Sequence, residues 1–266
     1  MLIYNKYGKP YNIKLPITII GSSSSGNSVR FDKIKTLVDI GLPYSHYPKD
    51  FFYQVRYVAL THEHPDHLNH STLKHIVEIY PNTKFIVSKR LYDFIKNHEI
   101  LKYEDFEKFT SRSKIFQPQD KVLLQMEGFQ IRPYETSHGP ITNVAYVIYV
   151  PNKNQENAVK IFYASDLDTL KPNPLKPEIE GVPQDIIFDV ACLEANYNAV
   201  KVREVLKRNP NDAKALGNLR HLSEQAATAY LRRHLKENGI FIPLHASSMY
   251  GTYSQDISIR KDTALK

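Results

Sequence analysis

The stretch THEHPDH, residues 61–67, follows directly after the apolar run at residues 57–60. It supplies four possible metal ligands within six residues: His62, His64, Asp66 and His67. In an extended segment, side chains two residues apart face the same side, so His62 and His64 can hold one ion. The intervening proline favours a turn, which directs the other two ligands towards a second ion. Imidazole and carboxylate groups suit Zn²⁺, Mn²⁺ or iron. The spacing therefore predicts a metal site, and the alternative is a polar loop with surface histidines.

Short apolar strands and amphipathic helices surround this stretch. The pattern predicts strands at residues 17–20, 29–31, 35–41, 57–60, 84–88, 121–126, 129–135, 143–150, 159–165, 185–195 and 240–244, and helices at residues 73–80, 90–98 and 223–238. In the last helix, Ser223 is placed to be the N-cap and Gly239 the C-cap. Residues 21–28, GSSSSGNS, are typical of a hairpin turn, although their backbone N–H groups could also face a phosphate.

This order of elements predicts the α/β class, with two packed sheets that carry outer helices. No internal repeat or long linker divides the chain. We therefore expect a single domain over residues 1–266, with a core at about residues 17–250, an N-terminal extension and a C-terminal tail.

The composition excludes several classes of protein. With 266 residues, 42% of them apolar, the chain can bury a core and is not disordered. Cys192 is its one cysteine, which excludes a disulfide scaffold and a cysteine-rich zinc site and favours a reducing compartment. No apolar run approaches the roughly 20 residues that span a bilayer, and the N-terminus lacks the apolar stretch of a signal peptide. We therefore expect a cytoplasmic protein with no membrane partner.

The net charge of +7 favours anionic partners such as phosphates or nucleic acid. The excess is uneven, because residues 200–266 hold 12 basic and 6 acidic residues and thus six of the seven net positive charges. We expect an anionic partner to meet the C-terminal part of the chain.

The THEHPDH stretch matches the HxHxDH signature of the metallo-β-lactamase superfamily, and other motifs of that family follow in the same order. The resemblance implies an αββα sandwich, with two mixed β-sheets flanked by helices and a binuclear metal site at one sheet edge. It also implies three further ligands, each beyond an apolar strand: His138, Asp166 and His245. The implied first ion takes His62, His64 and His138, the second takes Asp66, His67 and His245, and Asp166 bridges the two. The implied cofactors are two divalent ions, zinc or alternatively manganese or iron.

Two further aspartates bear on this site. Asp168 lies two residues beyond Asp166 and is an alternative bridge. Asp166 is preferred because it comes first after the strand, in a serine–aspartate pair like that of the family. Asp39, in the sequence LVDIG, resembles the aspartate that fixes the tautomer of a ligand histidine by accepting its other N–H. An ordinary strand-end aspartate is the alternative for Asp39.

The C-terminal segment resembles the phosphodiesterase and nuclease branch of the superfamily, which includes the tRNA 3′-processing enzymes. In residues 221–251 a histidine precedes a helix, and a strand then leads to the ligand histidine and two serines. His221 matches the position at which that branch has a histidine that assists phosphoryl chemistry. A helix-capping or core histidine is the alternative.

A closer resemblance rests on three motifs: SGNS at residues 25–28, LEANYN at residues 193–198 and RHLSEQAA at residues 220–227. They look like the YycJ type, a bacterial subfamily regarded as DNA exonucleases, and the likeness extends from about residue 17 to residue 245. The chain departs from this subfamily at Tyr197, Asn198 and Arg220, where the subfamily tends to have histidine, aspartate and glycine.

Together these resemblances imply a metal-dependent hydrolase that cleaves phosphodiester bonds, with DNA or RNA as candidate substrates. A two-metal site generates hydroxide near neutral pH and stabilises an in-line displacement. Asp66 would orient the attacking water as well as bind metal, and His221 would stabilise the charged phosphorane or protonate the leaving oxygen. Two alternatives stay open: a carboxyl-ester, thioester or lactone hydrolase with the same metals, and a non-enzymatic nucleic-acid-binding protein.

Overall fold

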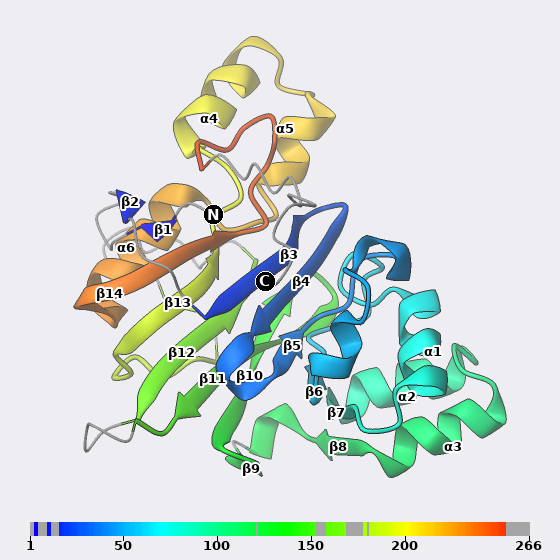
Figure 1. Ribbon diagram of the computed structural model, residues 1–266. Coiled ribbons are helices and arrows are strands. Elements are labelled where there is room, and N and C mark those ends of the chain that lie inside the picture. The colour runs from blue at the N-terminus through cyan, green and yellow to red at the C-terminus, as the bar shows by residue number, and fades with distance from the viewer. Residues whose placement is uncertain are drawn as a thin grey trace.

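Two β-sheets pack face to face in the computed structural model, and helices cover the outer face of each (Figure 1). The structure describes residues 16–120, 122–152, 158–168, 178–179 and 181–253, together with the backbone of two short strands near the N-terminus, β1 (Ile3–Tyr4) and β2 (Pro10–Tyr11). The other strands of the described chain are β3 (Ile17–Ser23), β4 (Gly26–Phe31), β5 (Thr36–Val38), β6 (Tyr57–Ala59), β7 (Lys84–Ser88), β8 (Ser113–Phe116), β9 (Leu124–Met126), β10 (Phe129–His138), β11 (Ile141–Val150), β12 (Val159–Ala164), β13 (Phe188–Glu194) and β14 (Leu235–Leu244). The α-helices are α1 (His70–Ile79), α2 (Lys89–Asn97), α3 (Tyr103–Ser111), α4 (Ala199–Arg208), α5 (Ala213–Asn218) and α6 (Glu224–His234), and short 3₁₀ helices occupy Asp32–Ile34, Tyr44–His46, Phe51–Gln54 and Pro118–Asp120.

Both sheets are mixed. The eight-stranded sheet has the order β2-β1-β14-β13-β12-β11-β10-β9, in which β12, β13 and β14 run parallel to one another. The six-stranded sheet has the order β3-β4-β5-β6-β7-β8, in which the β3–β4 hairpin pairs antiparallel with β5 and the strands from β5 to β8 run parallel. This arrangement confirms the predicted αββα sandwich. It also brings the carboxyl ends of strands from both sheets to one edge of the sandwich.

Consecutive residues of the central strands face different apolar cores. In β6, Val58 packs in the outer core beneath α1, α2 and α3, whereas Ala59 faces the other sheet. In β12, Phe162 packs towards α6 and Tyr163 lies between the sheets. Because both faces are buried, these strands are apolar throughout rather than alternately polar. Burial on both faces also specifies the strand register, and thus the direction of the side chains at the strand ends.

The last helix differs from its predicted extent at its C-terminal end. Ser223 is the N-cap as predicted, since its hydroxyl accepts a backbone N–H of the first turn. The helix ends at His234, however, and not at residue 238, so Gly239 is not its C-cap. Leu235 is already extended because its side chain is buried and its backbone pairs with Phe188, and this tertiary pairing overrides local helix propensity. Gly239 lies instead in β14, where a Cβ atom would come within 2.6 Å of the Leu235 side chain.

Other predicted boundaries also change. The turn predicted at residues 21–28 is a tight hairpin, because β3 and β4 stay paired as far as Ser23 and Gly26. The strand predicted from residue 185 begins at Phe188. The sequence patterns did not predict α3, α4, α5 or β8. The tail beyond residue 253, most of the predicted N-terminal extension and residues 153–157 lie outside the described residues. No helix of the described chain is long and apolar enough to cross a membrane.

Candidate metal centre

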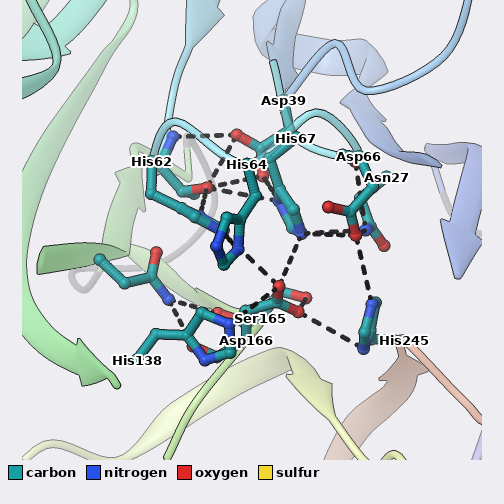
Figure 2. Close-up of polar contacts among 12 residues, drawn as sticks. Asn27, Asp39, His62, His64, Asp66, His67, His138, Ser165, Asp166 and His245 are labelled. Atoms are coloured by element: carbon teal, nitrogen blue, oxygen red, sulfur yellow. Dashed lines mark hydrogen bonds and ion pairs between the residues drawn. The ribbon is translucent and has the colours of Figure 1, made fainter. Parts of the chain in front are cut away.

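The predicted ligand residues converge at the edge of the sandwich where β6, β10, β12 and β14 end (Figure 2). The first ligand group comprises His62, His64, His138 and Asp166, and the second ligand group comprises Asp66, His67, Asp166 and His245. Within each group, one ligand atom of every residue lies within 4.8 Å of those of the others. Asp166 belongs to both groups. These are the groupings that the resemblance implies, and the role of each residue as a ligand stays a prediction.

The imidazoles of the first ligand group face one another. His62 Nε2 lies 3.0 Å from His64 Nδ1 and 3.6 Å from Asp166 Oδ2. His138 Nε2 lies 3.7 Å from the same carboxylate oxygen. The hydroxyl of Thr61 lies 3.0 Å from His62 Nδ1, and this contact turns Nε2 of that ring towards the group. Three ring nitrogens and a carboxylate therefore surround one point.

The second ligand group joins residues from both sheets. His67 Nε2 lies 3.3 Å from Asp166 Oδ2 and 3.7 Å from Asp66 Oδ2. His245 Nε2 lies 3.5 Å from Asp66 Oδ2, and His245 Nδ1 lies 3.4 Å from Asp166 Oδ1. His245 Nε2 is buried and makes no hydrogen bond in the described part of the chain. Buried polar atoms are nearly always paired, so this orphaned nitrogen beside a carboxylate fits a divalent cation as its partner.

Asp39 orients one of these histidines. It is fully buried, and its Oδ2 lies 2.7 Å from His67 Nδ1. The backbone N–H of Thr61 donates to Oδ1 at 2.9 Å, and the hydroxyl of Tyr163 donates to Oδ2 at 3.2 Å. With His67 Nδ1–H donating to Asp39, Nε2 is the ring nitrogen that faces the second ligand group and would bind a cation there. The contact is the one that the resemblance implies, and its effect on metal affinity stays a prediction.

Three site residues have left-handed backbone conformations: Asp39 (φ 61°), Asp166 (φ 52°) and His245 (φ 52°). This conformation costs roughly 1–2 kcal/mol for a residue other than glycine, and it persists where the surroundings enforce it. Asn143 Nδ2 donates to the carbonyl of Asp166 at 2.8 Å, and Asn196 Nδ2 donates to that of His245 at 2.7 Å. Each of the three residues comes within two positions of a strand end, where the turn directs its side chain across the sheet edge.

Burial and charge together set the protonation of the site when no cation is bound. Burial raises the pKa of Asp166, but the nearby imidazoles of His245 and His67 outweigh it and hold that pKa well below its usual value. Burial lowers the pKa of His67, but the carboxylates of Asp166 and Asp39 raise it well above its usual value. Burial, assisted by His67, lowers the pKa of His62 well below its usual value. The carboxylate is therefore ionised, and its charge is balanced by a proton that a divalent cation would replace.

Asp168 belongs to neither ligand group. Its carboxylate accepts the backbone N–H of Gly139 at 2.8 and 2.9 Å and lies 3.8 Å from His138 Nδ1. It therefore supports the turn that follows His138. Of the two candidate bridges, it is Asp166 that lies between the groups.

A third cluster of titratable side chains adjoins the second ligand group: Asp166, Glu194, His221 and His245. Glu194 is fully buried at the end of β13, and its Oε1 lies 2.7 Å from His221 Nδ1. Its Oε2 accepts the backbone N–H of Leu167 at 2.6 Å, which anchors the carboxylate. The His221 ring lies 4.9 Å from that of His245 and 5.5 Å from that of His138, measured between ring centroids. With 20% of its side chain exposed, His221 is an imidazole beside both groups that solvent can reach.

The Glu194–His221 pair favours the charged form of both partners. Burial lowers the pKa of His221, but the hydrogen bond to Glu194 outweighs it and raises that pKa. Burial raises the pKa of Glu194, but the hydrogen bond from His221 lowers it. The pairing therefore favours a protonated imidazole next to the candidate metal site.

Glu194, Asn27 and Asn196 contact the site but had no predicted role. Glu194 is a charged residue that ends the apolar run Val190–Leu193 of β13, and this pattern could have indicated a buried partner. The two asparagines carry no comparable signal, because amides near turns are common. Their roles depend on contacts between residues that are distant in sequence.

Two of the three positions at which the chain departs from the YycJ type directly precede α4. Tyr197 is buried in a small apolar cluster with Val202, Ala215 and Tyr250. Asn198 is the N-cap of α4, and its amide also donates to Glu224 Oε2 at 3.1 Å. Arg220 is exposed next to His221. Tyr197 and Asn198 thus anchor α4.

Residues 39–245 match the family model described as beta-lactamase superfamily domain. The fold is similar to that of the metallo-beta-lactamase fold protein YhfI from Bacillus subtilis, with a TM-score of 0.56, 19% identity and coverage of 87% of this chain and 86% of that one. It is also similar to a diphosphatase from the PhnP family (TM-score 0.50, 13% identity, 87% and 85% of the two chains) and to a long form RNase Z from yeast (TM-score 0.57, 13% identity, 91% of this chain and 39% of that one). A search of curated proteins gave no match. Because the matched segment covers most of the sequence and runs from Asp39 to His245, the chain belongs to the beta-lactamase superfamily.

Proposed function

We propose that the protein is a cytoplasmic, metal-dependent hydrolase that cleaves phosphodiester bonds. The observation that carries this proposal is the Glu194–His221 pair beside the two ligand groups. Cleavage of a phosphodiester builds negative charge on the phosphoryl oxygens and releases an alkoxide that needs a proton. An imidazolium held by a buried carboxylate meets both needs. The SGNS, LEANYN and RHLSEQAA motifs support assignment to the YycJ type.

The two ligand groups fit two divalent cations that share Asp166. Zinc is the proposed metal, and manganese or iron suits the same donor atoms. Such ions would supply a nucleophile from water near neutral pH and would stabilise the charge of the transition state. Asp66, with 21% of its side chain exposed, would both bind a cation and orient the attacking water.

His221 would donate a proton to the leaving oxygen or stabilise the charged phosphoryl group. Its Nδ1–H is engaged by Glu194, so Nε2 is the atom that would meet the substrate. General acid catalysis of this kind contributes typically about 10²–10⁴-fold to the rate.

The partner that we propose is DNA or RNA, held by the α4–α5 arm, residues 199–218. The arm follows β13, which ends at Glu194, and α5 ends at Asn218, shortly before His221, so short segments connect both of its ends to residues of the site. Figure 1 shows its two helices beyond the edge of the sheets. The arm and the turn after it carry six exposed basic residues, Lys201, Arg203, Lys207, Arg208, Lys214 and Arg220, against the acidic Glu204 and Asp212. A cationic surface next to the site suits a phosphate backbone.

A carboxyl-ester, thioester or lactone hydrolase is the second candidate. It would use the same ligand groups, with His221 as a structural residue. The exposed edge of His221 and the basic arm beside it favour the phosphodiester. A non-catalytic nucleic-acid-binding protein would not require two ligand groups, and the presence of residues for both favours the enzyme.

Hydrolysis assays on the zinc- or manganese-loaded protein test the proposal. We expect cleavage of bis-p-nitrophenyl phosphate and of end-labelled DNA or RNA, with a higher kcat/KM than for p-nitrophenyl acetate or a thioester. A preference for the carboxyl ester or thioester would replace the phosphodiester with the second candidate. Absence of bound metal in elemental analysis, together with salt-dependent nucleic-acid binding, would support the non-catalytic alternative.

A further inference from the structure

We propose that the β3–β4 hairpin assembles the second ligand group, through the side chains of Ser22 and Asn27. This inference rests on the proposed function, since it requires that cations bind both ligand groups. It also explains the Ser/Gly-rich motif GSSSSGNS, which the proposed reaction does not use.

Ser22 and Asn27 are directly opposite partners in the β3–β4 hairpin. Opposite residues of an antiparallel pair project from the same face, so the two side chains emerge together. Both residues are buried, with exposed fractions of 2% and 1%. Polar side chains buried in this way require partners, and each of these two meets a different member of the second ligand group.

Asn27 is hydrogen-bonded to Asp66, a member of the second ligand group that follows β6 (Figure 2). Its backbone N–H donates to the Asp66 carbonyl at 2.7 Å. Its Nδ2 lies 3.3 Å from that carbonyl and 3.3 Å from Asp66 Oδ2, and 2.9 Å from His67 Nε2. The backbone N–H of Asn27 therefore orients the Asp66 carbonyl. Its side-chain amide, which also contacts the Ser23 carbonyl at 3.0 Å, is placed to donate to the Asp66 carboxylate, beside the nitrogen through which His67 would bind a cation.

Ser22 is hydrogen-bonded to His245, a member of the second ligand group that follows β14 in the other sheet. The backbone N–H of His245 donates to Ser22 Oγ at 2.8 Å. This bond supports the left-handed backbone of His245, which places its Nε2 3.5 Å from Asp66 Oδ2. One hairpin thus connects two ligands that come from different sheets, Asp66 and His245.

Small residues make this close approach possible. A Cβ atom at Gly41 would lie 1.7 Å from the carbonyl oxygen of Asp66, and one at Gly21 would lie 2.6 Å from that of Gly26. The Gly41 N–H donates to the Asn27 carbonyl at 3.0 Å, so Gly41 contacts both the hairpin and the loop at residues 61–67 that carries Asp66. Glycine in a strand often marks such an approach of two backbones.

The first ligand group lacks this support. Within the described chain, neither Ser22 nor Asn27 hydrogen-bonds to its imidazoles, which belong to His62, His64 and His138. Loss of either hairpin side chain should therefore affect one cation position and spare the other.

Zinc affinities of the full-length protein, measured by competition with a chromophoric chelator, test this inference. Wild type is expected to bind two ions. We expect Asn27→Ala and Ser22→Ala each to weaken one binding step by about 10–100-fold and to leave the other within about twofold. Ser22→Thr keeps the hydroxyl and should retain the affinity. Ser24→Ala makes the same substitution at the exposed turn of the same hairpin and should change neither step.

Two variant proteins, each with one ligand group disrupted, identify which of the two ion positions is affected. In a His64→Ala protein, which keeps the second ligand group intact, added Asn27→Ala should weaken the remaining strong step by about 10–100-fold. In a His245→Ala protein, which keeps the first group intact, added Asn27→Ala should leave the remaining step unchanged. Far-UV circular dichroism in excess chelator monitors the fold of each variant. If Asn27→Ala does not fold, Asn27→Ser replaces it, because the serine hydroxyl is too short to reach the Asp66 carboxylate.

Unchanged affinities in both Asn27→Ala and Ser22→Ala would overturn the inference, and so would equal weakening of both steps. Wild type that binds fewer than two ions would overturn the two-metal site and this inference with it. That failure is visible in the wild-type titration alone, so it is distinguishable from failure of the hairpin variants.

Discussion

Glu194 and His221 form a carboxylate–imidazole pair in which Oε1 lies 2.7 Å from Nδ1, at the border of the second ligand group. Glu194 is fully buried and also accepts the backbone N–H of Leu167, so its carboxylate is held at two points. His221 is the partner that reaches solvent. The pair therefore fixes the orientation of the His221 ring.

His221→Ala should lower the rate of phosphodiester cleavage most where the leaving group is poor. A proton donor is needed for an alkoxide and hardly needed for p-nitrophenolate. We expect kcat on end-labelled DNA or RNA to fall by about 10²–10⁴-fold, with a much smaller loss on bis-p-nitrophenyl phosphate. Equal losses on the two substrates would remove His221 as a proton donor, and equal activity of the two proteins would remove it from the mechanism.

Glu194→Gln should reproduce part of this effect, because an amide keeps the shape of the carboxylate but not its charge. The pKa of His221 should fall once the carboxylate is gone, since Glu194 is what raises it against the effect of burial. NMR titration of the imidazole in the chelated protein measures this pKa. An unchanged pKa in Glu194→Gln would show that the pairing does not set the protonation of His221.

Asp39→Asn should weaken metal binding by about 10–100-fold, as is typical for residues that orient a ligand histidine. Four donors from Thr61, His67 and Tyr163 meet this carboxylate, and an amide NH₂ would oppose at least one of them. Zinc competition titrations measure the loss. Asp93→Asn, at an exposed carboxylate paired with Lys89, is the control and should bind zinc as wild type does. Wild-type affinity in Asp39→Asn would identify it as an ordinary strand-end residue.

Removal of metal should lower the melting temperature. An ion present at 100 times its Kd stabilises the folded state by about 2.7 kcal/mol, which corresponds to roughly 5–10 °C for a chain of this size. Melting curves with and without chelator measure the difference. Asp166→Ala, which removes the residue common to both ligand groups, should abolish the response to chelator, whereas Asp168→Ala should keep it. A full response in Asp166→Ala would place the metal elsewhere.

Charge reversal on the α4–α5 arm should affect polymeric substrates selectively. For the triple variant Arg203→Glu, Arg208→Glu and Lys214→Glu, we expect a higher KM for end-labelled DNA or RNA. The slope of log affinity against log salt concentration should also become shallower by about one for each phosphate that the arm no longer binds. The kcat/KM for bis-p-nitrophenyl phosphate should stay as in wild type. Lys84→Glu with Lys114→Glu, on β7 and β8 of the six-stranded sheet, is the control for charge reversal away from the arm. A parallel loss on the small substrate would indicate damage to the site rather than to a binding surface.

Gly41→Ala should destabilise the fold, because its Cβ atom would lie 1.7 Å from the Asp66 carbonyl oxygen. Overpacking of this kind reduces the free energy of unfolding by typically about 1–3 kcal/mol. Gly217→Ala in α5 meets nothing within 4 Å and should be neutral or stabilising by roughly 0.4–1 kcal/mol. Denaturant unfolding of both variants measures these changes. Equal stability of the two would mean that Gly41 and the backbone of Asp66 are not in close contact.

The two packed sheets and the ligand motif at residues 62–67 were predictable from local patterns, whereas the further ligands His138, Asp166 and His245 were implied by the family resemblance. Val58 and Ala59 belong to an apolar run whose burial on both faces predicts a central strand, and the ligand motif begins where that run ends. Parallel strands end at the same edge of a sheet, so a histidine or an aspartate that follows such a strand lies at that edge. His138, Asp166 and His245 lie near strand ends for this reason.

The parts that were not predictable depend on contacts between distant residues. Ser22 and His245 are 223 positions apart, and only the packing of the two sheets shows that they are bonded. Leu235 ends α6 early because Phe188 pairs with it, although the residues after it would continue a helix by local propensity. Asn27 and Asn196 likewise contact the site through residues that are distant from them in sequence, Asp66 and His245 respectively.

Anomalous diffraction from crystals grown with zinc or manganese, recorded at the absorption edge of the metal, tests the two-metal site most directly. We predict two peaks about 3.5–4 Å apart, one bound by His62, His64 and His138 and one by Asp66, His67 and His245, with the carboxylate of Asp166 between them. A single peak outside both ligand groups, or no peak at a metal concentration that saturates the protein in solution, would contradict the proposed metal centre.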